Sequence, residues 1–279
     1  MVTTTLTLGH SPDSDDAFMF YGLAAGKVGD GALAYEHILK DIQTLNEWAR
    51  EGRLDTTAIS VHAYAYVADK YAILNHGASM GEREYGPMVV ARSRASRETL
   101  SGATIAVPGL MTSAYLALRL CIGDFTPVVM PFDRIMRAVA AGEADYGLLI
   151  HEGQLTHEQQ GLHSIVNLGT WWFEQTGLPL PLGVNAIRRA LPDAVKRQAS
   201  AELKASIEYG LAHRTDALAW ALRYARGMET HTADTFVGMY VNQRTVDLGD
   251  EGRASIRLFL ERGAEAGIVP HVSSIDFIA

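Results

Sequence analysis

Residues 5–26, TLTLGHSPDSDDAFMFYGLAAG, contain the stretch that decides the fold. An apolar, β-branched strand leads straight into a helix start that carries three carboxylates beside a histidine. Similar strand ends, rich in hydroxyl, imidazole or carboxylate groups, occur in ISVHAYAYV (59–67), AVPGLMTSAYLAL (106–118) and YGLLIHE (146–152). Open parallel sheets bind ligands outside the carboxyl ends of their strands, where helix N-termini supply free N–H donors. The four polar strand ends therefore predict one shared cleft.

Short strands alternate with helices over the first part of the chain, a pattern typical of α/β proteins with parallel strands. Helices are expected over residues 15–26, 41–52 and 61–71, and the middle one has Asp41 as its N-cap and Gly52 as its stop. Residues 168–187 are expected to form a loop and a return strand. The chain is expected to be helical from Pro192 almost to its end.

This order predicts an α/β protein with a two-lobed periplasmic-binding-protein-like fold and two hinge strands. Lobe 1 is expected to comprise residues 1–92 plus 187–279, and lobe 2 residues 93–186. A single doubly wound sheet with a long helical tail would give a similar pattern, so the two architectures remain alternatives at this point.

The composition and charge of the chain limit the kinds of molecule that it is expected to bind. The net charge is −8 and the basic residues form no stripe, so nothing in the sequence favours nucleic-acid binding. The single cysteine, Cys121, excludes an intrachain disulfide and is expected to pack in the core. The N-terminal residues do not resemble a secretion signal, and no stretch approaches the roughly 20 apolar residues of a membrane span. These features predict a cytoplasmic protein without a membrane span.

His151 is the first candidate for chemistry, because it directly follows the apolar strand 146–150. Imidazole has an unperturbed pKa near neutrality, as a general base requires. The alternative is a histidine that only satisfies a backbone carbonyl at the edge of the core. His157 and His163 lie in polar sequence and are expected to face solvent.

Asp13, Asp15 and Asp16 lie at the start of the first helix, where carboxylates cap free N–H groups. Capping explains one or two of them, but adjacent like charges repel each other. We therefore expect at least one, Asp16 in particular, to orient a ligand hydroxyl or a catalytic group. The spacing gives little support for a metal site.

Hydroxyl groups begin two further helices, at Ser60 and at Thr112-Ser113. Hydroxyls beside unpaired helix N–H groups suit a carboxylate, although Ser and Thr are also the preferred N-caps. Trp171 and Trp172 are expected in a loop, either packed between the lobes or forming a flat wall for an aromatic ligand. No phosphate-binding loop, dinucleotide fingerprint or zinc-protease motif is present.

Six runs of this sequence resemble the 1,4-dihydroxy-6-naphthoate synthase family of menaquinone biosynthesis, in order and in spacing. They are SPDSDDAFMFYGLAAGKV (11–28), DIQTLNEWAREGRLDTTAIS (41–60), GPMVVARS (86–93), VPGLMTSAYLAL (107–118), ADYGLLIHEGQLT (144–156) and WWFEQTGLPLPLG (171–183). The resemblance covers nearly the whole chain and implies a fold similar to that of type II periplasmic binding proteins. It implies a carbon–carbon lyase that cleaves cyclic dehypoxanthine futalosine to a dihydroxynaphthoate and a sugar-derived fragment.

The resemblance also implies roles for individual residues. His151 is expected to be the catalytic base, and the expected substrate-binding residues are Ser11, Asp16, Ser60, Thr112, Ser113 and Ala114. Many family members carry Asn in place of Asp15 and Thr in place of Ser113, which changes the hydrogen bonding around the ligand.

No cofactor and no metal are expected, and the expected partner is a small-molecule substrate of a monomer or homodimer. Chorismate dehydratase of the same pathway and a non-catalytic carboxylate-binding protein on the same fold are the alternative functions.

Overall fold

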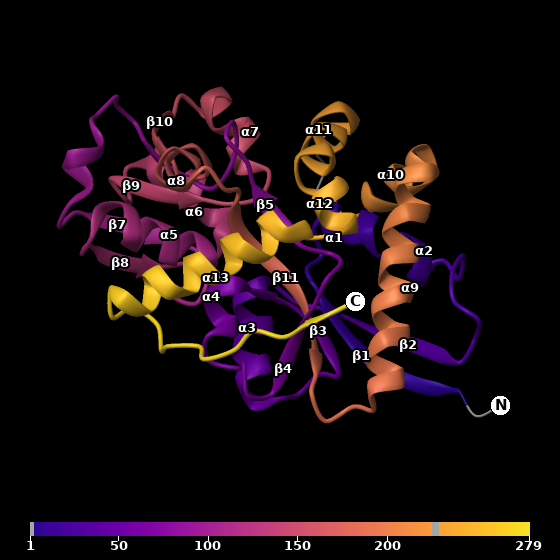
Figure 1. Ribbon diagram of the computed structural model, residues 1–279. Coiled ribbons are helices and arrows are strands. Elements are labelled where there is room, and N and C mark those ends of the chain that lie inside the picture. The colour runs from indigo at the N-terminus through magenta and orange to yellow at the C-terminus, as the bar shows by residue number, and fades with distance from the viewer. Residues whose placement is uncertain (1–2, 225–228) are drawn as a thin grey trace.

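The computed structural model describes residues 3–224 and 229–279, and it contains two β-sheets flanked by helices (Figure 1). The strands of the larger, seven-stranded sheet are β1 (Thr4–His10), β2 (Leu33–Leu39), β3 (Thr56–Ser60), β4 (Tyr71–Leu74), β5 (Ser79–Gly81), β11 (Leu180–Arg188) and β12 (Phe277–Ile278). Their order is β12-β4-β11-β3-β1-β2, with β5 paired to β11. The strands of the smaller, five-stranded sheet are β6 (Met88–Ala91), β7 (Thr104–Val107), β8 (Thr126–Val129), β9 (Tyr146–Leu149) and β10 (His163–Asn167). Their order is β10-β6-β9-β7-β8.

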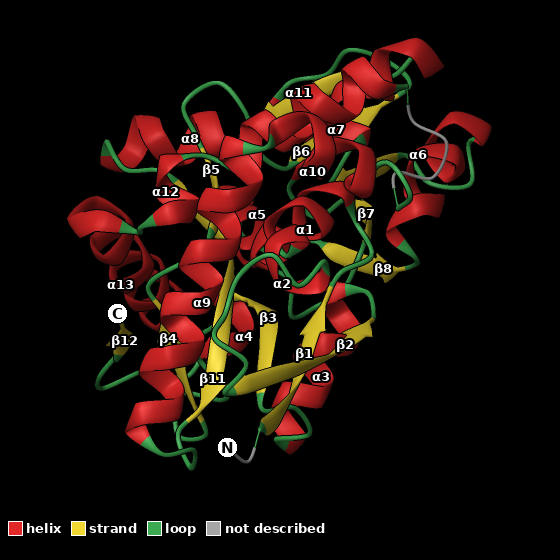
Figure 2. Cartoon of the chain, turned by 90° about the vertical axis from the view of Figure 1, so that its right-hand side faces the viewer, coloured by secondary structure: helices red, strands yellow, loops and turns green. Residues whose placement is uncertain are grey.

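Each sheet has a parallel part, and the polar strand ends belong to it. β1 pairs in parallel with β2 and β3, and β7 pairs in parallel with β8 and β9. β11 and β6 run antiparallel to their neighbours. Figure 2 shows β1, β3 and β11 side by side, with β7 and β8 of the smaller sheet beyond their ends. The carboxyl ends of β1, β3, β7 and β9 thus carry the candidate residues of the sequence.

Helices cover both sheets. They are α1 (Ser14–Met19), α2 (Tyr21–Ala24), α3 (Ile42–Glu51), α4 (Val61–Tyr64), α5 (Ser113–Ile122), α6 (Phe132–Ala141), α7 (Gly153–Thr156), α8 (Leu168–Thr176), α9 (Asp193–Ala212), α10 (Arg214–Ala221), α11 (Thr230–Tyr240), α12 (Gln243–Val246) and α13 (Gly249–Glu265). The helical stretch expected after Pro192 is confirmed by α9 to α13. Among the described residues, no helix is both long enough and apolar enough to cross a membrane.

Local signals determine α3. The side chain of Asp41 accepts a hydrogen bond from the backbone N–H of Thr44, and Gly52 ends the helix in the left-handed conformation at φ 68°. Both features were expected from the sequence, because Asp caps free N–H groups and Gly adopts positive φ without steric cost. Leu45 and Ala49 are buried on the inner face.

Two expected helices are shorter than predicted. The helix expected over 61–71 ends at Tyr64. Tyr71 instead begins β4, because residues 71–73 pair with β11 inside the larger sheet. The helix expected over 15–26 is divided at Phe20 into α1 and α2. Strand pairing with a distant segment overrides helical propensity at the first of these sites, and periodicity along the chain cannot reveal such a partner.

The prediction of a loop around Trp171 and Trp172 is wrong. Both lie in α8. The side chain of Asn167 caps the start of this helix by accepting hydrogen bonds from two backbone N–H groups, and Gly177 follows its end in the left-handed conformation. Trp172 is fully buried, and its Nε1–H donates to Oγ of Ser255 at 3.1 Å. Neither tryptophan lines the cavity that contains His151, so these two residues pack in the core rather than forming a wall for a ligand.

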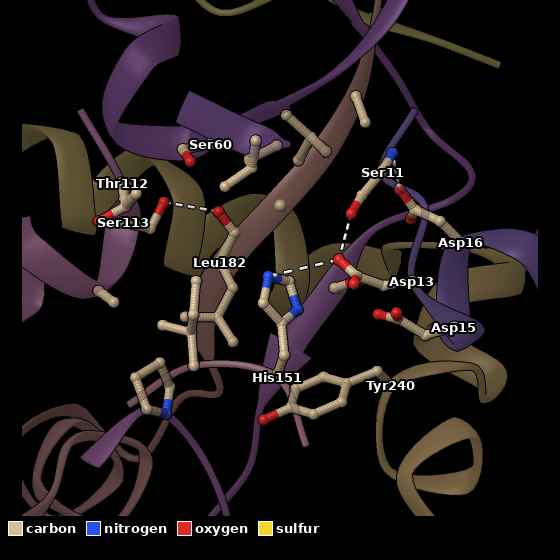
Figure 3. Close-up of a pocket in the computed structure, with 18 of the residues that line it drawn as sticks. Ser11, Asp13, Asp15, Asp16, Ser60, Thr112, Ser113, His151, Leu182 and Tyr240 are labelled. Atoms are coloured by element: carbon tan, nitrogen blue, oxygen red, sulfur yellow. Dashed lines mark hydrogen bonds and ion pairs between the residues drawn. The ribbon is translucent and has the colours of Figure 1, made fainter. Parts of the chain in front are cut away.

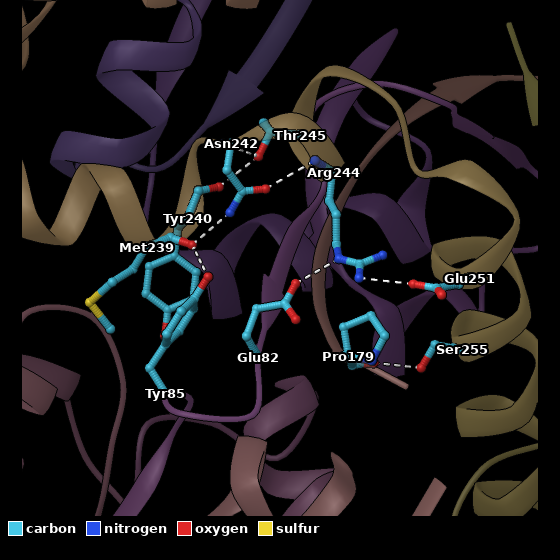
Figure 4. Close-up of polar contacts among 10 residues, drawn as sticks. All are labelled: Glu82, Tyr85, Pro179, Met239, Tyr240, Asn242, Arg244, Thr245, Glu251 and Ser255. Carbon is cyan, nitrogen blue, oxygen red and sulfur yellow. Dashed lines mark hydrogen bonds and ion pairs between the residues drawn. The ribbon is translucent and has the colours of Figure 1, made fainter. Parts of the chain in front are cut away.

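The chain passes from the larger to the smaller sheet between β5 and β6 and returns between β10 and β11. C-terminal helices hold the first passage, as Figure 4 shows: Arg244 pairs with Glu82 at 2.6 Å, and the hydroxyl of Tyr85 donates to the carbonyl of Met239 at 2.5 Å. β6 belongs to the smaller sheet and β11 joins the larger sheet from Leu180 onward. The lobe boundaries at 92/93 and 186/187 stay a prediction.

Candidate active site

A cavity with about 760 Å³ of empty space, its mouth included, lies where the polar strand ends of both sheets meet. Every candidate site residue expected from the sequence lines it: Ser11, Asp16, Ser60, Thr112, Ser113, Ala114 and His151. Figure 3 shows Ser60 and Thr112-Ser113 on one side of His151 and the turn with Ser11 and Asp16 on the other.

The turn after β1 is held by its own carboxylates. The backbone N–H of Ser11 donates to Oδ2 of Asp16 at 2.7 Å, and the hydroxyl of Ser11 donates to Oδ2 of Asp13. Asp13 precedes α1 as its N-cap residue, but its side chain makes no capping hydrogen bond. Helix capping therefore does not account for Asp13.

Burial changes the protonation of this turn. Burial is the largest cause that raises the pKa of Asp15, to about 8, and the neighbouring carboxylates of Asp16 and Asp13 raise it further. Burial likewise raises the pKa of Asp16, to about 7, against the opposing hydrogen bond from Ser11. Asp15, with a pKa of about 8, therefore retains its proton at pH 7 and can donate a hydrogen bond, whereas Asp16, with a pKa of about 7, is about half ionised there.

His151 follows β9 with only Ile150 between them, close to the position that the sequence predicted, and it lines the cavity. Its Nε2 lies 3.4 Å from Oδ2 of Asp13, and the edge of its ring meets Phe132 with 4.7 Å between ring centroids. Its backbone has φ 55°, the left-handed region that a non-glycine residue rarely adopts. Such conformations cost free energy and are concentrated at functional sites.

The hydroxyls at the start of α5 are occupied within the protein. Oγ1 of Thr112 accepts from the N–H of Tyr115 at 3.2 Å and donates to the carbonyl of Gly109 at 3.0 Å. Oγ of Ser113 donates to the carbonyl of Leu182 at 2.5 Å. The backbone N–H groups of Ser113 and Ala114 have no acceptor within the described residues. Two free N–H donors therefore face this end of the cavity, together with the partial positive charge of the helix.

The sequence did not identify Asn185, Tyr240 and Gln154, which also line the cavity. Asn185 lies on β11, and its Nδ2 donates to the carbonyl of Gly77 at 2.9 Å, while its buried Oδ1 has no partner among the residues described. The hydroxyl of Tyr240 donates to Oε1 of Gln154 at 2.7 Å. The sequence does contain one signal for Asn185: it is a polar residue inside the otherwise apolar run 180–187.

The prediction that His157 faces solvent is wrong. Its side chain is buried, and Nδ1 lies 3.1 Å from the carbonyl of Gln154. The short helix α7 folds back after β9, and this fold covers a residue whose local sequence is polar.

Comparisons with solved structures show the fold. The chain superposes on an alkanesulfonate-binding protein from Xanthomonas axonopodis pv. citri with a TM-score of 0.72 at 14% identity, over 97% of this chain and 96% of that one. It superposes on a protein from Archaeoglobus fulgidus with a TM-score of 0.90 at 44% identity, over 95% of this chain and 98% of that one. The two-lobed periplasmic-binding-protein-like fold expected from the sequence is confirmed.

Comparisons of sequence show the family. The model of the family described as menaquinone biosynthesis matches residues 6–265. A 1,4-dihydroxy-6-naphthoate synthase from Thermus thermophilus is 42% identical, over 95% of this chain and 96% of that protein. Another from Streptomyces coelicolor is 38% identical, over 97% of this chain and 96% of that protein. The chain therefore belongs to the menaquinone biosynthesis family, as these two synthases do.

Proposed function

We propose that this chain is a carbon–carbon lyase that cleaves cyclic dehypoxanthine futalosine to 1,4-dihydroxy-6-naphthoate and a sugar-derived fragment in menaquinone biosynthesis. Its two relatives named as 1,4-dihydroxy-6-naphthoate synthases support this function. The structural observation that carries the proposal is the single cavity that holds an imidazole, His151, opposite a helix start with free N–H donors.

The donors orient the substrate. The carboxylate of the naphthoate part is proposed to accept hydrogen bonds from the N–H groups of Ser113 and Ala114 and from the hydroxyl of Ser60. Helix N-termini bind anions because their N–H groups are unpaired and their dipole favours negative charge. Thr112 and the hydroxyl of Ser113 contribute by shaping this helix start, since their hydrogens are already donated to carbonyl oxygens.

Hydrogen-bond acceptors line the part of the cavity away from the start of α5. Oδ1 of Asn185 lacks a donor among the described residues, and Asp16 has one oxygen bound to Ser11. Hydroxyl groups of the sugar part are proposed to donate to these oxygens. A buried acceptor without a partner costs free energy, so a hydroxyl that reaches it is strongly favoured over an apolar group.

The proposed reaction begins with proton removal by His151, from a sugar hydroxyl or an adjacent acidic carbon. The electron pair released forms a new double bond in the sugar-derived part as the carbon–carbon bond breaks. The pair of the broken bond stays with the ring system, which takes up the proton that His151 returns and becomes aromatic. Asp13 stabilises the imidazolium that forms, because its carboxylate lies 3.4 Å from Nε2. The bond changes pass no electrons to an external acceptor, so the scheme includes no redox cofactor and no metal.

A substrate-conversion assay tests the function. The purified chain is incubated separately with cyclic dehypoxanthine futalosine and with chorismate, and products are identified by chromatography and mass spectrometry. The proposal predicts catalytic formation of 1,4-dihydroxy-6-naphthoate from the first compound only. Dehydration of chorismate would identify the sister activity, and tight binding without product would identify a binding protein. The cytoplasmic location and the monomeric or homodimeric state stay predictions.

A further inference from the structure

Asn46 lies behind the cavity wall on α3, and its side chain is completely buried. Its Oδ1 accepts a hydrogen bond from the backbone N–H of Ser60 at 2.8 Å. Its Nδ2 donates to Oγ of Ser60 at 3.0 Å and to the carbonyl of Met111 at 3.3 Å. One amide thus contacts both the end of β3 and the loop before α5.

The orientation of this amide is fixed by its neighbours. The N–H of Ser60 can only donate and the carbonyl of Met111 can only accept, so exchanging the oxygen and nitrogen of Asn46 would place like groups against each other. Nδ2 therefore faces Oγ of Ser60.

The direction of this hydrogen bond determines what Ser60 offers to a ligand. Because Oγ of Ser60 accepts from Asn46, the hydroxyl hydrogen stays available. No acceptor for it occurs within residues 3–224 and 229–279, and Ser60 lines the cavity. Ser60 is thus a preset hydrogen-bond donor, in contrast to Thr112 and Ser113, whose hydroxyl hydrogens are already donated.

The same face of α3 also holds the loop before α5. Oε1 of Gln43, three residues before Asn46, accepts from the backbone N–H of Met111 at 3.2 Å. The two side chains thus bind both polar groups of the Met111 backbone, next to the helix start with the free N–H groups of Ser113 and Ala114. Residues three apart on a helix lie on one face, which permits this double contact.

We propose that Asn46 is a positioning residue that fixes Ser60 as a donor and aligns it with the start of α5, so that the two together select a ligand carboxylate. This inference rests on the proposed function, because the carboxylate is that of the naphthoate. Asn46 itself does not touch the ligand. It acts through the direction of one hydroxyl hydrogen and through the position of one backbone loop.

The test compares two ligands that differ only in the carboxylate, 1,4-dihydroxy-6-naphthoate and 1,4-dihydroxynaphthalene, by calorimetric titration of the full chain. Asn46→Leu is expected to weaken binding of the naphthoate about tenfold or more, the size of one hydrogen bond to a charged group. Binding of the compound without the carboxylate should change less than about twofold. If Asn46→Leu does not yield folded protein, the smaller neutral variant Asn46→Ser is used to compare the same two ligands.

A double-variant cycle shows whether Asn46 acts through Ser60. In the Ser60→Ala background, Asn46→Leu is expected to weaken naphthoate binding by no more than about a further threefold. If the two residues acted independently, the losses of affinity from the two substitutions would multiply. Gln43→Ala is the matched control for the loop contact alone. Equal weakening of both ligands, or full additivity in the cycle, would overturn the proposal. These readouts are separate from turnover: a wild-type chain that binds the naphthoate without converting the cyclic substrate contradicts the proposed function only.

Discussion

Nε2 of His151 lies 3.4 Å from Oδ2 of Asp13, and this contact joins the turn after β9 to the turn after β1. A buried carboxylate beside an imidazole stabilises the charged form that appears when the imidazole accepts a proton. Asp13 is held in turn by the hydroxyl of Ser11. The two turns come from different sheets, so the pair exists only when both sheets are assembled.

Asp13→Asn removes the charge and keeps the shape. If Asp13 stabilises the imidazolium, kcat should fall by at least about tenfold, the effect of about 1.4 kcal/mol on the barrier, while KM changes little. Steady-state kinetics with the cyclic substrate check this. Ser11→Ala, which removes only the hydroxyl that holds Asp13, should show a smaller loss of kcat. An unchanged kcat in Asp13→Asn would remove the carboxylate from the mechanism.

Ser60 and Thr112 are expected to respond differently to loss of their hydroxyls. Ser60→Ala should raise KM about tenfold, because its hydroxyl hydrogen is free for the ligand, and should lower stability only modestly, because Nδ2 of Asn46 loses Oγ of Ser60 but keeps the carbonyl of Met111. Thr112→Val should lower stability by about 1 kcal/mol, because its hydroxyl caps α5, and should raise KM as the helix start loosens. Thermal unfolding and steady-state kinetics of both variants test whether the Ser60 hydroxyl binds the ligand and the Thr112 hydroxyl caps the helix. An unaltered KM in Ser60→Ala would show that the Ser60 hydroxyl does not bind the ligand.

The pKa of Asp15 predicts an unusual pH dependence of stability. Its folded pKa of about 8 lies above its ordinary value of 3.8. Between these values the unfolded chain releases the proton while the folded chain keeps it, so the free energy of unfolding falls as pH rises from about 4 to about 8. Asp15→Asn removes this loss and should therefore stabilise the protein at pH 8 more than at pH 5.

Melting temperatures of Asp15→Asn and the parent chain at both pH values measure this effect. Other titrating groups, such as the buried His10, whose pKa is lowered to about 4, occur in both proteins, so their contributions largely cancel in the difference. His151, Asp13, Asp16 and Tyr240 interact electrostatically with Asp15, so the measured difference reports the proton of Asp15 together with its coupling to these neighbours. A gain in stability that is equal at pH 5 and pH 8 would show that Asp15 does not retain its proton.

Much of the site followed from the sequence because parallel strands bring their carboxyl ends together. The residues after β1, β3, β7 and β9 could be assigned to one cleft without knowledge of the strand order. The caps of α3 were equally local, since Asp41 and Gly52 act on adjacent backbone.

The remaining features depend on contacts between distant segments. Asn185 and Tyr240 reach the cavity from β11 and α11, and only the assembled sheets place them beside Asp15 and His151. The helix expected over 61–71 overlaps β4 at Tyr71, and the sequence around Tyr71 could not reveal this strand because its partner in β11, Arg188, lies more than 100 residues away along the chain. Hydrogen-bond direction, which distinguishes the free hydroxyl of Ser60 from the occupied one of Thr112, is not encoded in residue type.

The central claim is that His151 is the base. His151→Asn tests it best, because Asn tolerates the left-handed backbone at φ 55° and lacks the imidazole. The decisive measurement is the single-turnover rate of naphthoate formation at saturating substrate, with the melting temperature measured in parallel. If His151 is the base, the rate should be about 10² to 10⁴ times lower than that of the parent chain, and the melting temperature should be undiminished. A folded variant that retains a rate within about threefold of the parent would contradict it.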